Sequence, residues 1–145
     1  GFMALSEVAL ASLILVVWMY FQGKMGLANE VIYNTIEGIL ITDTSGKIIS
    51  VNPSFTRITG YQENEVIGKN PSILKSGKQP QTFYKDLWKS IEKNGFWQGE
   101  ILNSRKDGQQ YLQWLTISAI KNNAGDVVQY AGMFSDISSH KMKKS

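Results

Sequence analysis

FWQGEILNSRKDGQQYLQWLT, residues 96–116, consists of two apolar runs separated by a polar turn. The runs are rich in the aromatic and bulky apolar residues that suit strands, and the Asp107-Gly108 pair between them is typical of a tight turn. The stretch therefore predicts an antiparallel hairpin. Each strand of the hairpin carries a side-chain amide where a simple core would not have one, Asn103 or Gln113, and the role of these two amides is the first functional question.

The two amides fall on the same predicted face of the hairpin. Side chains alternate along a strand, so one face carries Trp97, Gly99, Ile101 and Asn103 from the first strand and Tyr111, Gln113, Leu115, Ile117 and Ala119 from the second. This is the better core face. A buried amide without partners costs about 1–3 kcal/mol, so the pair would bond to each other or to a flat heteroaromatic ligand in a slot shaped by Trp97 and the Gly99 gap. The simpler alternative is that Asn103 caps the turn and Gln113 lies at a wet rim.

The opposite face of the hairpin is also apolar. It carries Phe96, Leu102, Leu112 and Trp114. Soluble monomers seldom leave such patches open, so we expect the hydrophobic N-terminal segment or a second copy of the domain to cover it.

The rest of the chain predicts an α+β domain. Residues 39–42 and 48–51 form a second hairpin, residues 53–60 and 63–68 form single helical turns, and residues 127–134 form a last strand. Residues 27–35 are a helical lead-in, and residues 80–93 form a helix that ends at Asn94-Gly95, with Phe83, Leu87, Trp88 and Ile91 on one face. Two strands, a helical middle and three strands predict an antiparallel sheet.

Residues 2–21 are hydrophobic and contain one charge, Glu7. About 20 apolar residues suffice to span a bilayer, and the alternative is a hydrophobic helix that is buried against the domain or in a dimer. We therefore divide the chain into an N-terminal hydrophobic helix (1–27), a folded domain (28–138) and the start of a linker (139–145).

Composition excludes several classes of function. Of the 15 basic residues, Lys141, Lys143 and Lys144 lie in the tail, so the remaining 12 balance the 12 acidic residues and no nucleic-acid-binding face is expected. The chain has no cysteine, and its only histidine is His140 in the tail, so neither haem nor a metal site is expected.

An acid/base pair of Asp43 and Glu100 would be needed for the simplest hydrolytic chemistry. The two residues fall on different strands, in turn or outer-face positions, where solvated surface charge is the better interpretation.

Four segments together resemble a PAS domain over about residues 28–138: ILITDTSGKIISVNPSF, ITGYQENEVIGKNPSILKSG, LWKSIEKNGFWQGEILNSRKDG and YAGMFSDIS. The resemblance implies a five-stranded antiparallel sheet with short helices over one face, enclosing a pocket. It also implies a sensory and dimerising module of a bacterial signal-transduction protein, and not an enzyme. Asp136-Ile137-Ser138 resembles the terminal motif that passes the signal to the next element, here an effector beyond residue 145.

The third segment is most similar to the FAD-binding branch of the family, which includes aerotaxis receptors and nitrogen-fixation regulators. That similarity, together with the related light-sensing LOV domains, implies that Asn103 and Gln113 hydrogen-bond the flavin ring. The implied site comprises Asn103, Gln113, Trp88, Trp97, Asn70, Leu115, Phe134 and Lys75. Lys75 begins a short basic loop that would approach a dinucleotide phosphate, or would be an ordinary exposed turn.

The sequence departs from these relatives at two positions. Pro71 stands where LOV domains have their photoactive cysteine and nitrogen-fixation regulators a carboxylate, and Phe134 replaces a LOV glutamine. A cysteinyl photoadduct is therefore excluded.

Two functional hypotheses remain. The first is a redox or oxygen sensor that holds FAD noncovalently, and the second is a cofactor-free or small-ligand module for dimerisation and signal relay. We expect a homodimer through the N-terminal helix and the outer sheet face. We also expect a cytoplasmic domain, either free or anchored at the inner membrane by that helix.

Overall fold

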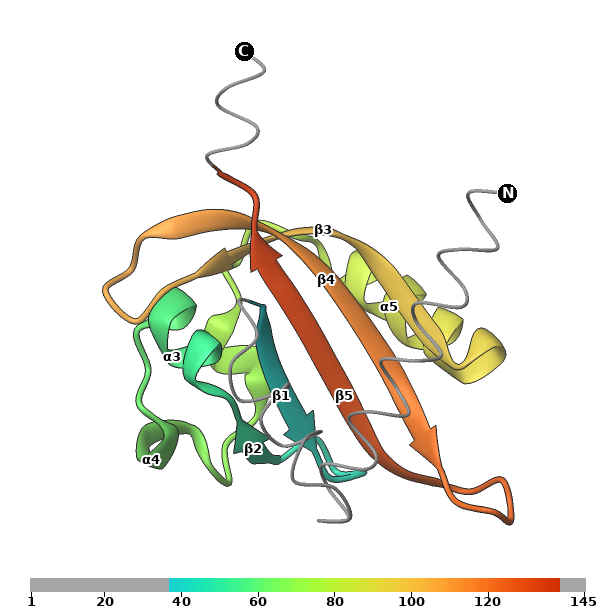
Figure 1. The fold of residues 1–145 in the computed structure, drawn as a ribbon. Coiled ribbons are helices and arrows are strands. Elements are labelled where there is room, and N and C mark those ends of the chain that lie inside the picture. Colours follow the sequence, from blue (N-terminus) through green and yellow to red (C-terminus); the bar gives the residue numbers. More distant parts are fainter. Residues whose placement is uncertain (1–36, 139–145) are drawn as a thin grey trace, which may run out of the picture.

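A computed structural model describes residues 37–138. Its five strands form one antiparallel sheet in the order β2-β1-β5-β4-β3. The strands are β1 (Gly38–Thr42), β2 (Ile48–Val51), β3 (Phe96–Ser104), β4 (Gln110–Lys121) and β5 (Val127–Asp136). The predicted hairpins and the α+β class are confirmed, and β5 continues two residues beyond the predicted end (Figure 1).

Short helices connect the two halves of the sheet. They are α3 (Pro53–Thr59), α4 (Glu63–Val66), a 3₁₀ turn η1 (Pro71–Leu74) and α5 (Gln81–Asn94). The predicted stop of α5 is confirmed, because Gly95 adopts φ +86° and donates its N–H to the Ile91 carbonyl. The sequence analysis missed η1, which begins where the Asn70 side chain accepts a hydrogen bond from the Ser72 N–H at 2.9 Å.

Several expectations lie outside the described residues: the N-terminal hydrophobic helix, the helical lead-in at 27–35 and the linker after residue 138. Within residues 37–138, no helix is long and apolar enough to cross a membrane.

The inner face of the sheet carries the core. The core consists of strand residues packed against α3 and η1: Leu40, Ile101, Leu115 and Phe134 from the strands, Phe55 of α3 and Leu74 of η1.

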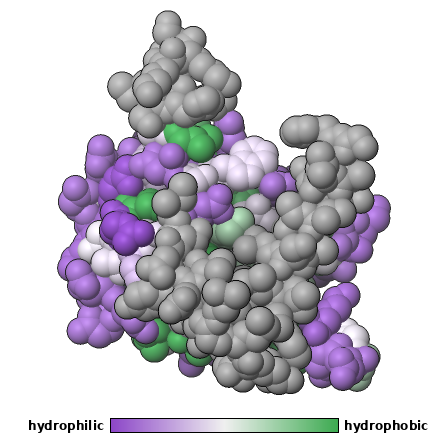
Figure 2. Space-filling view, in the orientation of Figure 1, coloured by the Kyte–Doolittle hydropathy of each residue, from purple (hydrophilic) through white to green (hydrophobic). Residues whose placement is uncertain are grey.

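The outer face of the sheet is only partly open. Trp114 is 40% exposed, whereas Phe96, Leu102 and Leu112 are partly buried. The described surface visible in Figure 2 is mostly hydrophilic, with hydrophobic residues in small separate patches.

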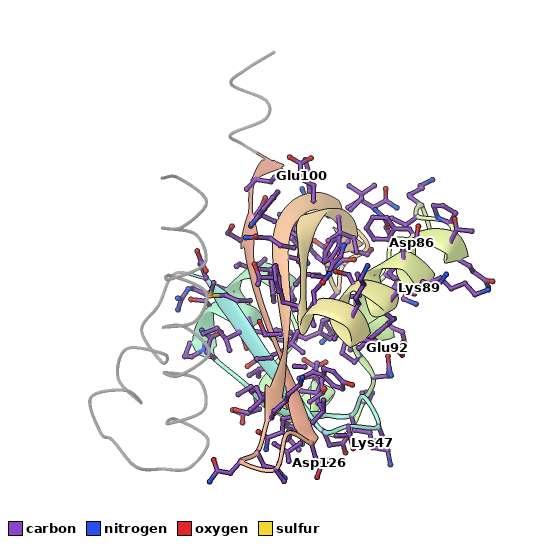
Figure 3. The ribbon with its side chains drawn as sticks, turned by 90° about the vertical axis from the view of Figure 1, so that its right-hand side faces the viewer. Lys47, Asp86, Lys89, Glu92, Glu100 and Asp126 are labelled. Carbon is purple, nitrogen blue, oxygen red and sulfur yellow. The ribbon has the colours of Figure 1, made fainter. Side chains whose placement is uncertain are left out.

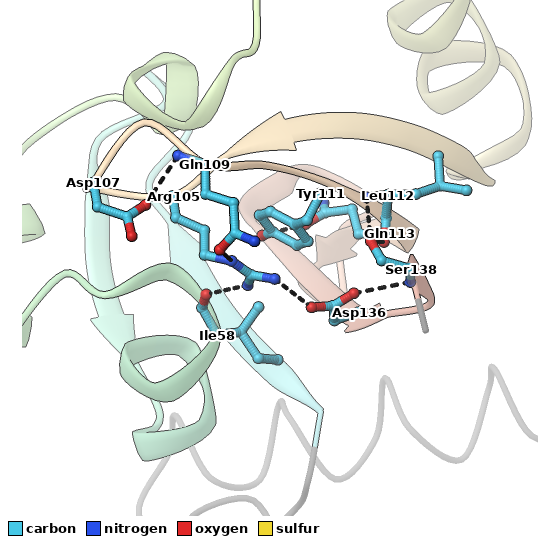
Figure 4. A network of polar contacts seen from close by, with 9 residues as sticks. All are labelled: Ile58, Arg105, Asp107, Gln109, Tyr111, Leu112, Gln113, Asp136 and Ser138. Atoms are coloured by element: carbon cyan, nitrogen blue, oxygen red, sulfur yellow. Dashed lines mark hydrogen bonds and ion pairs between the residues drawn. The ribbon is translucent and has the colours of Figure 1, made fainter. Parts of the chain in front are cut away.

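One arginine joins three segments of the fold. Arg105, in the β3–β4 turn, donates from Nη1 to the Ile58 carbonyl of α3 at 2.6 Å and from Nη2 to Asp136 Oδ2 at 2.5 Å. Its guanidinium lies 4.1 Å from the centre of the Tyr111 ring (Figure 4). The last residue of β5 is therefore held by a side chain that also contacts the core tyrosine.

Asp136 is a titratable member of this junction. Partial burial alone would raise the pKa of Asp136, but hydrogen bonds from Arg105 and the Ser138 N–H outweigh burial and hold the pKa below its ordinary value. The ionised carboxylate is therefore the form that the fold stabilises.

Gly38 makes room for an aromatic ring of the core. It pairs with Phe134 across β1 and β5, and a Cβ at Gly38 would lie 2.5 Å from that ring. Gly132 on the neighbouring strand is less crowded, since its Cβ would meet Leu40 at 3.4 Å.

We predict that Gly38→Ala lowers the free energy of unfolding by about 1–3 kcal/mol, because the added methyl group displaces the Phe134 ring from its packed position. Gly132→Ala is the matched control and should cost less than about 1 kcal/mol. Urea unfolding followed by tryptophan fluorescence measures both. Equal costs for the two variants would contradict the proposed crowding.

Asp136→Asn should lower the free energy of unfolding by about 0.5–1 kcal/mol at pH 7. Because the folded-state pKa lies below the unfolded value of about 3.9, the ionised form stabilises the fold above that pH and the contribution is lost as the pH falls through the folded-state pKa. The difference between wild type and variant should therefore close below about pH 4. Asp126→Asn, at an exposed turn, should show no such closing; a difference for Asp136→Asn that does not vary with pH would refute the assignment.

Candidate ligand-binding cavity

A cavity of about 350 Å³ lies between the inner face of the sheet and the segment from η1 to α5. Its sheet side is formed by apolar residues that include Leu40, Ile101, Leu115 and Phe134. Cavities of this size are typical of small-molecule sites, which are mainly apolar with a few placed polar groups.

Most of the predicted site residues line this cavity. They are Asn103, Gln113, Trp88, Asn70, Leu115, Phe134 and Lys75. The structure thus brings together side chains from η1 and its flanks, α5 and three strands of the sheet. Their contact with a flavin stays a prediction.

Trp97 is the exception, and the structure corrects the expected slot. The Trp97 ring lies over Gly99, where an added Cβ would be 2.8 Å from Trp97 Cζ2. The same ring packs edge-to-face on Phe83, with ring centres 5.6 Å apart. Trp97 is absent from the cavity lining. The glycine gap is therefore filled by the tryptophan of the same strand, which leaves no slot there for a ligand.

The two amides are buried and paired. Asn103 is 7% exposed and Gln113 is 2% exposed, so the alternative of a turn cap and a wet rim is wrong. In the orientation that satisfies its hydrogen bonds, Asn103 accepts from Gln113 Nε2 at 3.1 Å. Asn103 Nδ2 then donates to the Leu74 and Leu102 carbonyls at 3.1 and 3.2 Å. Asn103 therefore fastens η1 to the sheet while it lines the cavity.

The sequence analysis assigned no role to Tyr111, which completes this polar group. The Tyr111 hydroxyl donates to Gln113 Oε1 at 2.7 Å, and the side chain is only 2% exposed. Burial raises the pKa of the Tyr111 hydroxyl well above its ordinary value, so the phenol is protonated at neutral pH. Strand alternation places Tyr111 on the same face as Gln113, and this is the only feature of the sequence that indicates a contact between the two side chains.

The mouth of the cavity carries aromatic and basic groups. Trp88 is 43% exposed and lies edge-to-face with Tyr130, with ring centres 5.3 Å apart. Lys75 Nζ is 4.0 Å from the centre of the Tyr84 ring. Lys75 is thus exposed, as the simpler interpretation held, and it is also one of the residues that line the cavity.

The described residues do not bring Asp43 and Glu100 together (Figure 3), and they contain no metal-binding cluster. Asp43 accepts hydrogen bonds from Ser45 and Lys47 in the β1–β2 turn, and Figure 3 shows Lys47 and Glu100 at opposite ends of the molecule. Asp43 and Glu100 are therefore not an acid/base pair. Within residues 37–138, no group of three or more His, Cys, Asp or Glu side chains is placed to hold a metal ion.

Two known proteins are similar to this chain in sequence. A nitrogen fixation regulatory protein of Klebsiella oxytoca is 33% identical over 117 residues, which are 81% of this chain and 24% of that protein. Phototropin-1A of Oryza sativa subsp. japonica is 32% identical over 100 residues, 68% of this chain and 11% of that protein. The chain thus spans about a quarter or less of the length of these relatives.

Solved structures and a family model agree with the architecture. A PAS domain from Colwellia psychrerythraea superposes with a TM-score of 0.72 at 23% identity, over 77% of this chain and 94% of that one, which supports the fold. A light-oxygen-voltage domain studied with a flavin analogue gives a TM-score of 0.70 at 26% identity, over 83% and 91%. The family model of the PAS domain matches residues 36–139, most of the chain, and the chain therefore belongs to the PAS domain family.

Proposed function

We propose that this PAS domain is a redox or oxygen sensor that binds FAD noncovalently in the cavity. The observation that carries the proposal is the pair of buried amides on the sheet side of an otherwise apolar cavity. A cavity for an apolar ligand alone would not need them, since each buried amide must be hydrogen-bonded to avoid a cost of about 1–3 kcal/mol.

The amides keep hydrogen-bonding capacity for a ligand. Gln113 Nε2 has two N–H groups and donates one of them to Asn103. Asn103 Oδ1 has two lone pairs and uses one of them to accept this bond. Among the described residues, no hydrogen bond accounts for the second N–H or the second lone pair. The pyrimidine edge of a flavin, with alternating carbonyl and N–H groups, would use both.

The apolar residues of the cavity suit the isoalloxazine ring of FAD, and the basic group at its exposed end suits the phosphates. Leu115 and Phe134 would contact the isoalloxazine faces, while Lys75 would meet a phosphate at the exposed end of the cavity. A bound flavin supplies reversible electron uptake, which changes the protonation of its ring. The similarity to a light-oxygen-voltage domain studied with a flavin analogue supports this ligand class.

We propose that a change in the bound ligand is transmitted through side chains of the sheet to the end of β5. Gln113 contacts Tyr111, the Tyr111 ring contacts Arg105, and Arg105 holds Asp136 at the end of β5. A ligand that changes the hydrogen bonds of Gln113 would thus alter the segment that continues toward residue 145. The outer-face patch of Phe96, Leu102, Leu112 and Trp114 is our proposed homodimer surface, and membrane anchoring by residues 2–21 stays a prediction.

A cofactor-free relay module is the second candidate, and one observation favours it. Asn103 and Gln113 bond to each other and to protein partners, so neither amide depends on a ligand to make a hydrogen bond. This candidate predicts a colourless protein that takes up no flavin.

We predict that the purified chain, supplied with FAD, retains a yellow flavin with a structured absorption band. Asn103→Ala should weaken FAD binding about tenfold to a hundredfold, because a buried hydrogen-bond partner is lost. Gln98→Ala, at an exposed amide on the other face of β3, is the control and should bind as wild type. Flavin fluorescence titration measures the affinities, and a wild-type chain that binds no flavin would favour the cofactor-free module.

Lys75→Met should weaken FAD binding about twofold to fivefold and leave riboflavin binding unchanged, because only FAD carries phosphate for the partly exposed ammonium group. Lys78→Met, in the same loop but outside the cavity lining, is the matched control and should affect neither ligand. If Lys75→Met weakens riboflavin as much as FAD, the lysine acts through its packing on Tyr84 and not through a phosphate.

A further inference from the structure

A row of hydrogen bonds runs along the inner face of the sheet from the Leu74 and Leu102 carbonyls through Asn103 and Gln113 to Tyr111. The two carbonyls determine which group donates and which accepts in each bond. The carbonyls of Leu74 and Leu102 can only accept hydrogen bonds, so the Asn103 group that faces them must be the Nδ2 donor. Asn103 Oδ1 then faces Gln113, which must offer its Nε2 group. Backbone groups, which cannot reverse their polarity, thus determine how Asn103 is oriented, and Asn103 holds the Gln113 amide on one side only.

Tyr111 closes the row at its other end. Since Gln113 turns Nε2 toward Asn103, its Oε1 faces the Tyr111 hydroxyl, which donates at 2.7 Å. The phenol is protonated and buried, and its ring is held from the other side by the Arg105 guanidinium at 4.1 Å (Figure 4). Tyr111 itself does not line the cavity, so it can act on a ligand only through Gln113.

We propose that Tyr111 is the positioning residue that holds the Gln113 amide in one orientation, so that the cavity accepts a ring edge with a carbonyl next to an N–H group. The ligand carbonyl would accept from the second N–H of Gln113, and the ligand N–H would donate to the second lone pair of Asn103 Oδ1. This inference rests on the proposed function for its ligand and extends it, because it names the group that sets which ring edges are recognised.

Removal of the hydroxyl would release the amide. Without the Tyr111 hydroxyl, none of the hydrogen bonds among residues 37–138 supplies a donor to Gln113 Oε1, in a site where the side chain is 2% exposed. A buried acceptor in that position is unfavourable, so the amide would rotate to seek another partner. It would then present carbonyl or N–H to the cavity in a mixture of orientations.

The binding test uses riboflavin and four forms of the full chain: wild type, Tyr111→Phe, Gln113→Leu and the double variant. Tyr111→Phe should weaken riboflavin binding about tenfold, the factor expected for one well-placed hydrogen bond. In the Gln113→Leu background the same change should have no further effect, because the group that Tyr111 positions is absent. An equal loss in both backgrounds would mean that Tyr111 supports the cavity generally, and would overturn the inference.

A second measurement needs no ligand. In a ¹⁵N-labelled wild-type chain, the side-chain NH₂ signals of Gln113, assigned by their loss in Gln113→Leu, should be two sharp resonances in slow exchange with water. In Tyr111→Phe they should shift and broaden, while the NH₂ signals of Gln109 in the turn stay in place. Unchanged Gln113 signals would overturn the inference.

The two measurements separate the possible failures. If wild type binds no riboflavin but the Gln113 signals respond to Tyr111→Phe, the flavin proposal fails and the positioning role stands. If riboflavin binds and the signals do not respond, the positioning role fails alone.

Discussion

A row of buried hydrogen bonds across the inner face of the sheet is the constraint on which the rest of this domain depends. It runs from the Leu74 and Leu102 carbonyls through Asn103 and Gln113 to Tyr111. Buried polar groups are costly unless all are satisfied, and hydrogen bonds between them are stronger in a medium of low dielectric. The row therefore fixes η1 on the sheet and keeps two amides at an apolar cavity.

The same row connects the cavity to the end of the domain. The Tyr111 ring lies under Arg105, and Arg105 binds both the end of α3 and Asp136, the last residue of β5. In the proposed relay, a change at Gln113 would reach the end of β5 through three contacts between neighbouring side chains: Gln113 with Tyr111, Tyr111 with Arg105, and Arg105 with Asp136. In the proposed function, the affinity for a ligand and the transmission of its presence would both depend on the orientation of the Gln113 amide.

The sequence predicted the fold and most of the cavity, because strand alternation and turn chemistry are local. The Asp107-Gly108 pair predicted the turn, and strand alternation placed Asn103 and Gln113 on the core face. The expected slot at Gly99 was wrong because the Trp97 ring fills that gap from two positions along the strand, and alternation does not encode rotamers. A contact between Trp97 and a flavin stays a prediction. Tyr111 had no predicted role, because the sequence pattern of a tyrosine on a core face is the same whether its hydroxyl donates to an amide or to water.

The central claim is that the two amides receive the polar edge of a flavin. A crystal structure of the chain grown with riboflavin tests it most directly. We expect the pyrimidine edge of the ring within about 2.7–3.2 Å of Gln113 Nε2 and Asn103 Oδ1, with Tyr111 still bonded to Gln113 Oε1. A ring bound elsewhere, or a cavity without a ring in crystals saturated with riboflavin, would contradict the account.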